Sequence, residues 1–294
     1  MVTKLNGVEK LLSVFECNAE PVFDRIIREN RIPLDSQEWD HACAFIALLD
    51  QRLPIAREAL KQSADWMMNL VAESTLGTKE RLADSLKHIE ANTGQKLEFD
   101  LESARRLIEE GGVSASVPQN WYIQMMLELS ARLAPLIGQM TPHLLVSGDA
   151  EFITGDCPLA KRDRKPSGFF GLGWALKTVE VGLPLGRNHC IVLTWDPVPR
   201  VMHADRDAVA NVNCQIAQWA MRYVLGPRDN FVWMDRDESV KSRAKLLFAK
   251  MSAAKINRQL IRTWPPRPKR ATERVSAQSG SQSRTLRRRR RRKK

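Results

Sequence analysis

The sequence changes from helical to extended character within residues 118–155, which read PQNWYIQMMLELSARLAPLIGQMTPHLLVSGDAEFITG. In the first part of this stretch, apolar side chains recur at three- and four-residue steps, the spacing that gathers them on one face of a helix. That face carries Tyr122, Met125, Met126, Leu129, Leu133, Leu136, Ile137 and Met140. From His143 onward, short β-prone runs broken by glycine and aspartate replace the helical period. The stretch therefore predicts a helical layer before it and a sheet after it.

Helical patterns also fill the chain before residue 118. Pro54 should end one helix and begin the next, because proline has no N–H but fits the first turn of a helix. Thr78 and Asp100 are expected N-caps, since their side-chain oxygens can accept free N–H groups, and Gly94 is an expected C-terminal stop. The predicted helices cover residues 9–17, 21–29, 39–53, 55–73, 79–92 and 101–110.

After residue 140 the pattern predicts a small sheet and then closing helices. The β-prone runs are residues 143–147, 151–154, 178–182 and 190–195. The charged run 161–165 looks like part of an exposed loop between them. Later segments predict a helix over 205–224, an edge strand over 231–234 and a last helix over 238–263. The fold class is therefore α+β and predominantly helical. One domain over 1–264 would hold a helical layer (1–140), a small central sheet (141–200) and closing helices (201–264).

The formal net charge of +12 is confined to the end of the chain. From Arg267 onward there are 13 Lys or Arg residues and one acidic residue, Glu273, which together give +12. The rest of the chain has 33 basic and 33 acidic residues. Residues 265–294 also lack apolar periodicity and are rich in Ser, Gln, Gly and Arg. Such a segment buries too little apolar surface to fold, so we expect a disordered polybasic tail.

The end of this tail is a run of cations: Arg287, Arg288, Arg289, Arg290, Arg291, Arg292, Lys293 and Lys294. Polybasic segments bind phosphate backbones through counterion release, independently of base sequence. No aromatic residue follows Trp264, so base stacking by the tail is not expected. Two alternatives stay open: contact with an anionic membrane surface, and a tail that is simply solvated.

Several classes of protein are not favoured by the sequence. No run approaches the roughly 18 apolar residues of a spanning helix, and no signal peptide is evident, so we expect a cytoplasmic protein without a membrane span. The five cysteines lack CxxC spacing and the five histidines lack HxxxH spacing. We therefore expect neither a metal site nor a cofactor. The oligomeric state is left open.

Three separated motifs resemble DUF4238, a bacterial family of domains of unknown function. Residues 45–47 (FIA), followed by 51–54 (QRLP) and Arg57, are similar to the family's FIALQ, R-T-P and R. Residues 152–158 (FITGDCP) resemble F-I-T-S-D-N-P, and residues 182–185 (GLPL) before the apolar run 190–193 resemble its P-L-S-P and strand. The family usually begins with His-x-x-Pro-Gln-x-Tyr-Leu, which this chain lacks. The resemblance implies no activity.

Three polar residues are the best candidates for a site. Asp156 follows a β-prone run, where a strand end can present a carboxylate to a ligand; the alternative is an Asx-turn. Asn213 falls on the inward face of its helix, where it could instead be a satisfied core amide. Arg52, like Arg57, flanks Pro54 and could bind a carboxylate or phosphate, or form a helix-end salt bridge.

Two functional hypotheses follow. The first is a binding or accessory protein whose basic tail associates non-specifically with nucleic acid. The second is an enzyme, of the hydrolase or nuclease type, with Asp156, Arg52 and Asn213 converging on one polar site. We favour the first, because these residues do not assemble a recognisable catalytic mechanism.

Overall fold

The computed structural model describes residues 2–32, 36–76, 78–94, 96, 100–103, 106, 118–165 and 172–249. The chain divides into two units, Met1–Lys245 and Leu246–Lys294. Of the second unit only residues 246–249 are described, and they are helical. The predicted tail and the domain boundary at residue 264 lie outside the described residues. Everything below concerns the first unit.

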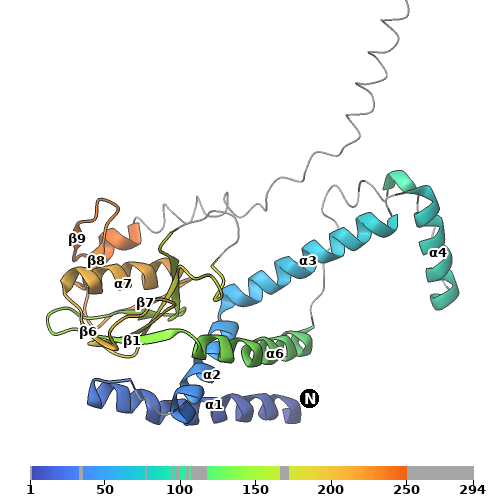
Figure 1. Ribbon diagram of the computed structural model, residues 1–294. Helices are drawn as coiled ribbons and strands as arrows, with labels where there is room; N and C mark the ends of the chain where they lie inside the picture. Colours follow the sequence, from blue (N-terminus) through green and yellow to red (C-terminus); the bar gives the residue numbers. More distant parts are fainter. Residues whose placement is uncertain are drawn as a thin grey trace, which may run out of the picture. The chain divides into compact units, whose positions relative to one another are not determined.

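Helices make up the first part of the chain (Figure 1). They are α1 (Val2–Glu29), α2 (Ser36–Arg52), α3 (Pro54–Leu76), α4 (Lys79–Thr93) and α6 (Gln119–Gly138). The predicted helix signals are confirmed at several ends. Pro54 is the first residue of α3. The Thr78 side chain accepts a hydrogen bond from Arg81 N at 3.3 Å, and Gly94 has the left-handed conformation that ends α4.

One prediction about the helices is wrong. The short pair over 9–17 and 21–29 is a single helix, α1, with Pro21 inside it. An internal proline removes one backbone hydrogen bond and costs roughly 3 kcal/mol. Burial of Ala19, Val22 and Ile26, which share one face of α1's second half, offsets that cost, since these side chains are at most 4% exposed. Packing has overridden the local signal.

A mixed five-stranded sheet follows, in the order β3-β4-β5-β1-β6. Its strands are β1 (Thr141–Val146), β3 (Ala160–Asp163), β4 (Val179–Pro184), β5 (His189–Thr194) and β6 (Val201–His203). Neighbouring strands pair antiparallel, except that β1 and β6 are parallel. The predicted small central sheet and the predominance of helix are confirmed.

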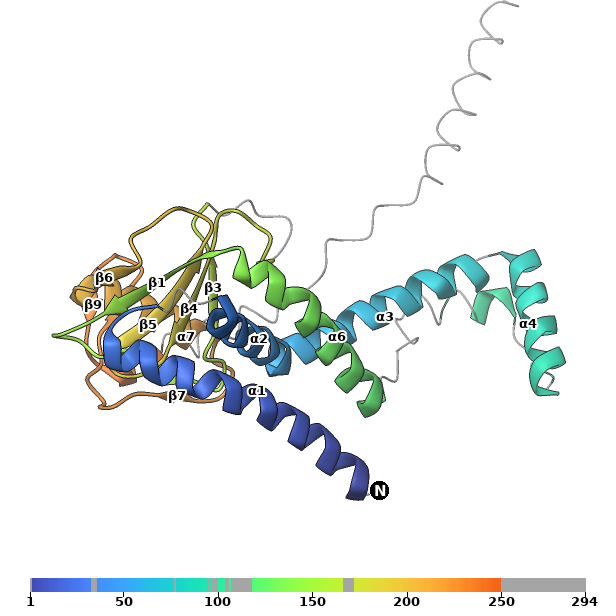
Figure 2. The same cartoon turned by 60° about the horizontal axis from the view of Figure 1, so that its bottom comes forward.

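The sheet lies between two helical layers. Figures 1 and 2 place α7 (Arg206–Trp219) on one face and α1, α2 and α6 on the other. The main core is on the second face, where alternate strand residues meet the helices. It includes Ile26 of α1, Ile46 of α2, Ile137 of α6, and Leu144, Val181, Ile191 and Leu193 of the sheet.

The remaining strands are short. β2 (Thr154–Gly155) pairs with β7 (Val224–Leu225), and β8 (Trp233–Met234) pairs with β9 (Val240–Lys241). The predicted helix over 205–224 begins as expected, with Asp205 capping the Ala208 N–H at 2.8 Å. It ends earlier, at Trp219, because the chain is drawn into pairing with β2.

Two further predictions need correction. Only Arg164 and Lys165 of the run 161–165 are exposed and outside a strand, because residues 160–163 form β3. Its charged side chains face partners from distant segments, which local composition does not reveal. The predicted helix over 238–263 does not begin at 238. Glu238 has a φ of +59°, and Asp235 N donates to Ser239 O at 3.0 Å, so these residues form the β8–β9 turn.

Candidate functional site

A buried ion pair joins the edge of the sheet to α2. Lys161 Nζ of β3 lies 2.7 Å from Asp50 Oδ1, and the two side chains are 11% and 8% exposed. The other carboxylate oxygen, Oδ2, accepts hydrogen bonds from Trp174 Nε1 at 2.9 Å and from Gln51 Nε2 at 3.1 Å. Burying two charges opposes folding unless their geometry is good, so such pairs are candidates for functional positions.

Two indole rings flank the Lys161 ammonium. Nζ lies 5.0 Å from the ring centroid of Trp174 and 6.0 Å from that of Trp219, within the range of cation–π attraction. Both rings are held by their own hydrogen bonds. Trp219 Nε1 donates to the Lys161 carbonyl at 2.8 Å, and Trp174 Nε1 donates to Asp50 Oδ2, while the Trp174 backbone carbonyl accepts from Trp195 Nε1 at 3.0 Å. The ammonium is therefore held in a fixed position.

This group borders a pocket of about 370 Å³, which we call the Lys161 pocket. Asp50 and Gln51 line it from α2, Lys161 from β3 and Trp219 from the end of α7. Apolar side chains of α3 and α6 supply most of the remaining wall: Ile55, Ala56, Ala59, Leu60, Met126 and Leu129. An apolar pocket with a few convergent polar groups is the usual form of a small-molecule site.

Tyr122 completes the wall from α6. Its hydroxyl donates to the Gln51 carbonyl at 3.0 Å, and the Arg57 guanidinium lies 5.3 Å from its ring centroid. Burial raises the pKa of the Tyr122 phenol, so the group stays a neutral donor at pH 7. Arg57 also donates to Gln119 Oε1 at 3.3 Å. Tyr122 therefore links α2 to α6 beside the pocket.

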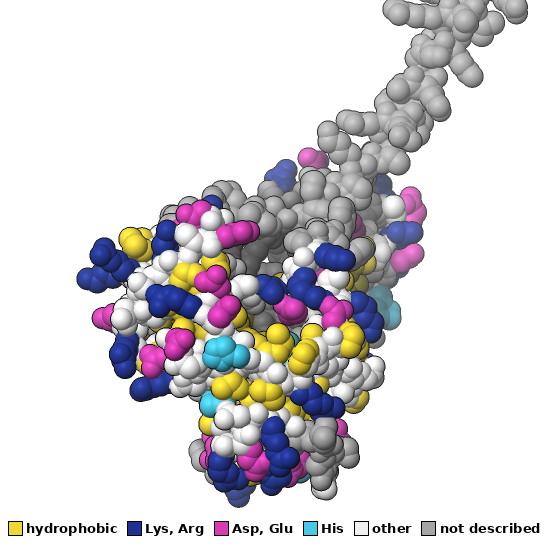
Figure 3. All heavy atoms as spheres, turned by 60° about the vertical axis from the view of Figure 1, so that its left-hand side comes forward, with side chains coloured by type: hydrophobic (Ala, Val, Ile, Leu, Met, Phe, Trp, Pro, Cys, Tyr) yellow, Lys and Arg dark blue, Asp and Glu magenta, His cyan; other side chains and the backbone are white. Residues whose placement is uncertain are grey.

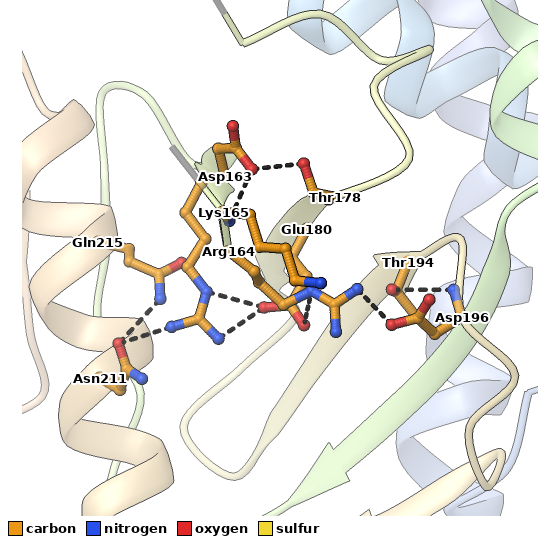
Figure 4. Close-up of polar contacts among 10 residues, drawn as sticks. Asp163, Arg164, Lys165, Thr178, Glu180, Thr194, Asp196, Asn211 and Gln215 are labelled. Carbon is orange, nitrogen blue, oxygen red and sulfur yellow. Dashed lines mark hydrogen bonds and ion pairs between the residues drawn. The ribbon is translucent and has the colours of Figure 1, made fainter. Parts of the chain in front are cut away.

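A second polar cluster lies on the opposite face of the sheet, because neighbouring residues of a strand point to opposite faces. Here Glu180 of β4 lies between two guanidinium groups (Figure 4). Arg162 Nε and Nη2 are 2.7 Å and 2.6 Å from Glu180 Oε2, and Arg164 Nε is 3.3 Å from Oε1. Arg164 also pairs with Asp196, and Arg162 Nη1 donates to Asn211 Oδ1 on α7 at 3.2 Å.

The predicted candidate Asp156 ties the FITGDCP segment to the end of α7. Its Oδ1 accepts from Met221 N at 2.9 Å, and its Oδ2 accepts from Arg222 N at 2.8 Å. The Asp156 N–H donates to the Tyr223 carbonyl at 3.1 Å. The carboxylate thus bonds the backbone just beyond α7.

Asn213 is completely buried in the middle of α7. Its Oδ1 accepts from Ile153 N at 2.9 Å, while its Nδ2 donates to the carbonyls of Glu151 at 2.9 Å and Val232 at 2.8 Å. The FITGDCP segment is thus hydrogen-bonded to α7 through Asn213 and to the backbone just beyond α7 through Asp156. In these contacts Asn213 is a satisfied core amide.

Arg52 has a different partner and a different place. At the end of α2 its Nη1 lies 2.6 Å from Glu16 Oε1 of α1, and both side chains are more than one-third exposed. Within the described part of the chain, no hydrogen bond or ion pair joins any two of Arg52, Asp156 and Asn213.

The Lys161 pocket contains none of these three candidates. Asp50 and Lys161 stand about 110 residues apart, and neither carries a local motif. Gln51, within the QRLP element of the family resemblance, lines the pocket and is the sequence signal nearest to it. Only the folded chain brings α2, β3 and Trp174 together.

The other expectations concern metals, membranes and the tail. No group of three or more His, Cys, Asp or Glu side chains is arranged to hold a metal ion among the described residues. None of the described helices combines the length and apolar character needed to cross a bilayer. The run Arg287–Lys294 lies outside the part of the chain that the structure describes.

Comparison with known proteins gives the family. The model of the family described as "Protein of unknown function (DUF4238)" matches residues 3–230. The chain therefore belongs to the DUF4238 family, as the three motifs predicted. No curated protein and no solved structure matches it.

Proposed function

We propose that this DUF4238 protein is a binding protein whose Lys161 pocket takes a small ligand and whose basic tail associates with nucleic acid. The observation that carries the first part is the Asp50–Lys161 pair between two indole rings at the wall of an apolar pocket. The buried thiols of Cys43 and Cys190 form no disulfide, which supports placing this role in a reducing compartment such as the bacterial cytoplasm.

The polar groups of the pocket favour a ligand with an oxygen acceptor. Both oxygens of Asp50 already accept hydrogen bonds or face the ammonium. The Lys161 ammonium has three N–H donors, and Asp50 is its one ion-pair partner within the described residues. A carboxylate or carbonyl head would therefore meet Lys161, while the apolar walls cover an alkyl or aromatic body.

Three probes with the same body test this chemistry: hexanoate, hexanamide and hexylamine. We expect the first two to bind, measured by isothermal titration calorimetry, and the amine to bind at least about tenfold more weakly, because its charge faces Lys161. The first two probes separate a charged head from a neutral one. Equal binding of all three probes would show that Lys161 does not discriminate between their head groups and would contradict the proposal.

A pocket-filling variant separates specific binding from surface adsorption. Ala59 is exposed at the pocket mouth on α3, so Ala59→Phe should obstruct the pocket without disturbing the core. The matched control is Ala83→Phe, at an exposed position of α4 outside the pocket. We expect hexanamide binding to be lost in Ala59→Phe and kept in Ala83→Phe. Unchanged binding in both variants would contradict the proposal.

The charge distribution supports the role proposed for the tail. All of the net +12 belongs to residues 267–294, and the rest of the chain is neutral. On the face drawn in Figure 3, positive and negative side chains are interspersed, which does not favour a phosphate backbone there. A chain ending at Pro266 should lose nucleic-acid binding, and full-length binding should fall steeply with salt. Equal binding by both chains would refute this role.

The alternative is a hydrolase or nuclease with a site at Asp156, Arg52 and Asn213, and it stays a prediction. The contacts of these side chains do not favour it, because each is engaged with a different partner. Its test is a hydrolase and nuclease screen of the wild type beside Asp156→Asn. Activity in the wild type that the variant lacks, at equal stability, would favour the enzyme.

A further inference from the structure

A second cavity, of about 140 Å³, lies between the sheet and α7 on the face opposite the Lys161 pocket. We call it the His143 cavity. Its floor is formed by His143 of β1, Gly182 of β4 and Val192 of β5, and its roof by Asn211, Val212 and Gln215 of α7. It is thus separate from the site of the proposed function.

The cavity lies over one row of the sheet, in which the two positions on β3 and β4 have little or no side chain. Across the strands this row runs Ala160, Gly182, Val192 and His143. A Cβ atom on Gly182 would meet Cys190 Sγ and Val212 Cγ1, each at 3.9 Å, which is ordinary van der Waals contact. The fold therefore has room for a side chain where the sequence has none.

His143 is a buried polar group without a partner in the described chain. Its side chain is 7% exposed, and its Nδ1 atom is buried with no hydrogen bond. Most buried polar atoms in folded proteins are paired, so an exception needs an explanation. Burial lowers the pKa of the imidazole, which keeps the ring neutral at pH 7. A neutral imidazole offers one donor and one acceptor.

The charged groups at the cavity's edge are already paired. Arg162 donates to Glu180 and to Asn211 Oδ1, so a charged ligand would have to break these contacts. Asn211 Oδ1 also accepts from Gln215 Nε2 at 2.9 Å. This leaves the Asn211 N–H₂ and the Gln215 carbonyl without a hydrogen bond among the described residues. They are a neutral donor and acceptor one helical turn apart.

We propose that the His143 cavity binds a small, neutral, planar ring with an amide edge, that is, an N–H beside a C=O. The volume is close to that of cavities, about 150 Å³, that hold a benzene ring. Val192 and Val212 cover the ring faces, and His143, Asn211 and Gln215 pair with its edge. Cyclic amides such as pyridones and pyrimidinones have this chemistry.

The test uses 2-pyridone as the probe, with N-methyl-2-pyridone as the analogue that lacks the N–H. Titration of the full-length protein is followed by saturation-transfer NMR. We expect saturable 2-pyridone binding with a Kd of about 1 mM or below, since a ligand of this size has few atoms to contribute. The N-methyl analogue should bind at least about tenfold more weakly.

Gly182→Ala is the decisive variant. It adds a methyl group inside the cavity at unstrained distances, so the protein should fold normally while 2-pyridone binding falls at least about tenfold. Gly7→Ala, a substitution in α1 with nothing near the added methyl, is the matched control and should bind like the wild type. Gln215→Leu, which removes the acceptor from α7, should weaken 2-pyridone more than its N-methyl analogue.

Three results would overturn the proposal. They are an absence of saturable binding of 2-pyridone to the wild type, equal binding of the two analogues, and binding that survives Gly182→Ala in a folded protein. The probes of the Lys161 pocket, with their flexible alkyl bodies, are not expected to compete with 2-pyridone. Competition between the two probe sets would place both at one site and contradict the separate cavity.

Discussion

Replacing Lys161 with methionine should destabilise the folded protein by about 3 kcal/mol. The change keeps most of the aliphatic stem but leaves the Asp50 carboxylate, 8% exposed, without its cation. Breaking a buried ion pair on one side costs roughly 3–5 kcal/mol. The low end applies here, because Trp174 and Gln51 still donate to Asp50.

Replacing Asp50, the other member of the pair, should lower the free energy of unfolding further. Asp50→Leu leaves the Lys161 ammonium, 11% exposed, with two indole rings and no acceptor, so we expect a loss of about 4–5 kcal/mol. In the double variant no unpaired charge remains. Its stability should return to within about 2 kcal/mol of the wild type, the residual loss reflecting the Trp174 N–H that has lost its acceptor.

Equilibrium unfolding in urea of the wild type, the two single variants and the double variant completes a double-mutant cycle. The dependence of the unfolding free energy on urea concentration should be the same in all four, which checks that unfolding exposes the same surface. Lys61→Met, at an exposed position of α3, is the matched control and should leave stability within about 0.5 kcal/mol of the wild type. A Lys161→Met protein as stable as the wild type would refute the argument. So would additive single losses, since they would mean that the two charges do not interact.

Other parts of the structure give three further predictions. Gly155→Ser should lower the unfolding free energy by about 2 kcal/mol or more in thermal or urea unfolding, because a Cβ would lie 2.7 Å from the Tyr223 carbonyl oxygen; a neutral effect would contradict this packing. Asn213→Ala should cost about 3 kcal/mol, since it leaves three backbone groups unpaired, and a stable variant would remove Asn213 from the structural role described. Burial holds the His143 pKa below its unfolded value of 6.5, so the unfolded state binds more protons and the free energy of unfolding falls as pH drops below about 6.5. In His143→Gln the free energy of unfolding should depend less on pH in this range. An unchanged pH dependence would show that His143 is not its source.

The helices and the strands of the sheet's centre could be predicted because their signals are local. Pro54, Thr78 and Gly94 act on the backbone within a turn, and they end or begin helices as expected. Where packing opposes a local signal the prediction is wrong, as at Pro21 inside α1. The same is true of β3, whose charges looked solvated but are neutralised by residues far along the chain.

The candidate site was harder to predict from the sequence, because it too depends on contacts between distant segments. Asp156 and Asn213 stand out locally, but their partners are backbone groups of distant segments, so their contacts hold the fold together. Asp50 and Lys161 are ordinary residues of a helix and a strand, and only their meeting across the core makes them unusual. A buried pair formed by residues so far apart has no spacing that a sequence pattern could detect.

The indole N–H signals of the tryptophans test the account of the Lys161 pocket most directly. The chain has eight tryptophans, and Trp→Phe substitutions would assign their signals in a ¹H–¹⁵N correlation spectrum. During titration with hexanamide, the signals of Trp174 and Trp219 should shift saturably, because both rings flank Lys161. Trp233, which is buried in β8 outside the pocket, should stay unchanged. Saturable shifts confined to other indoles, or none at all, would contradict a ligand site at Lys161.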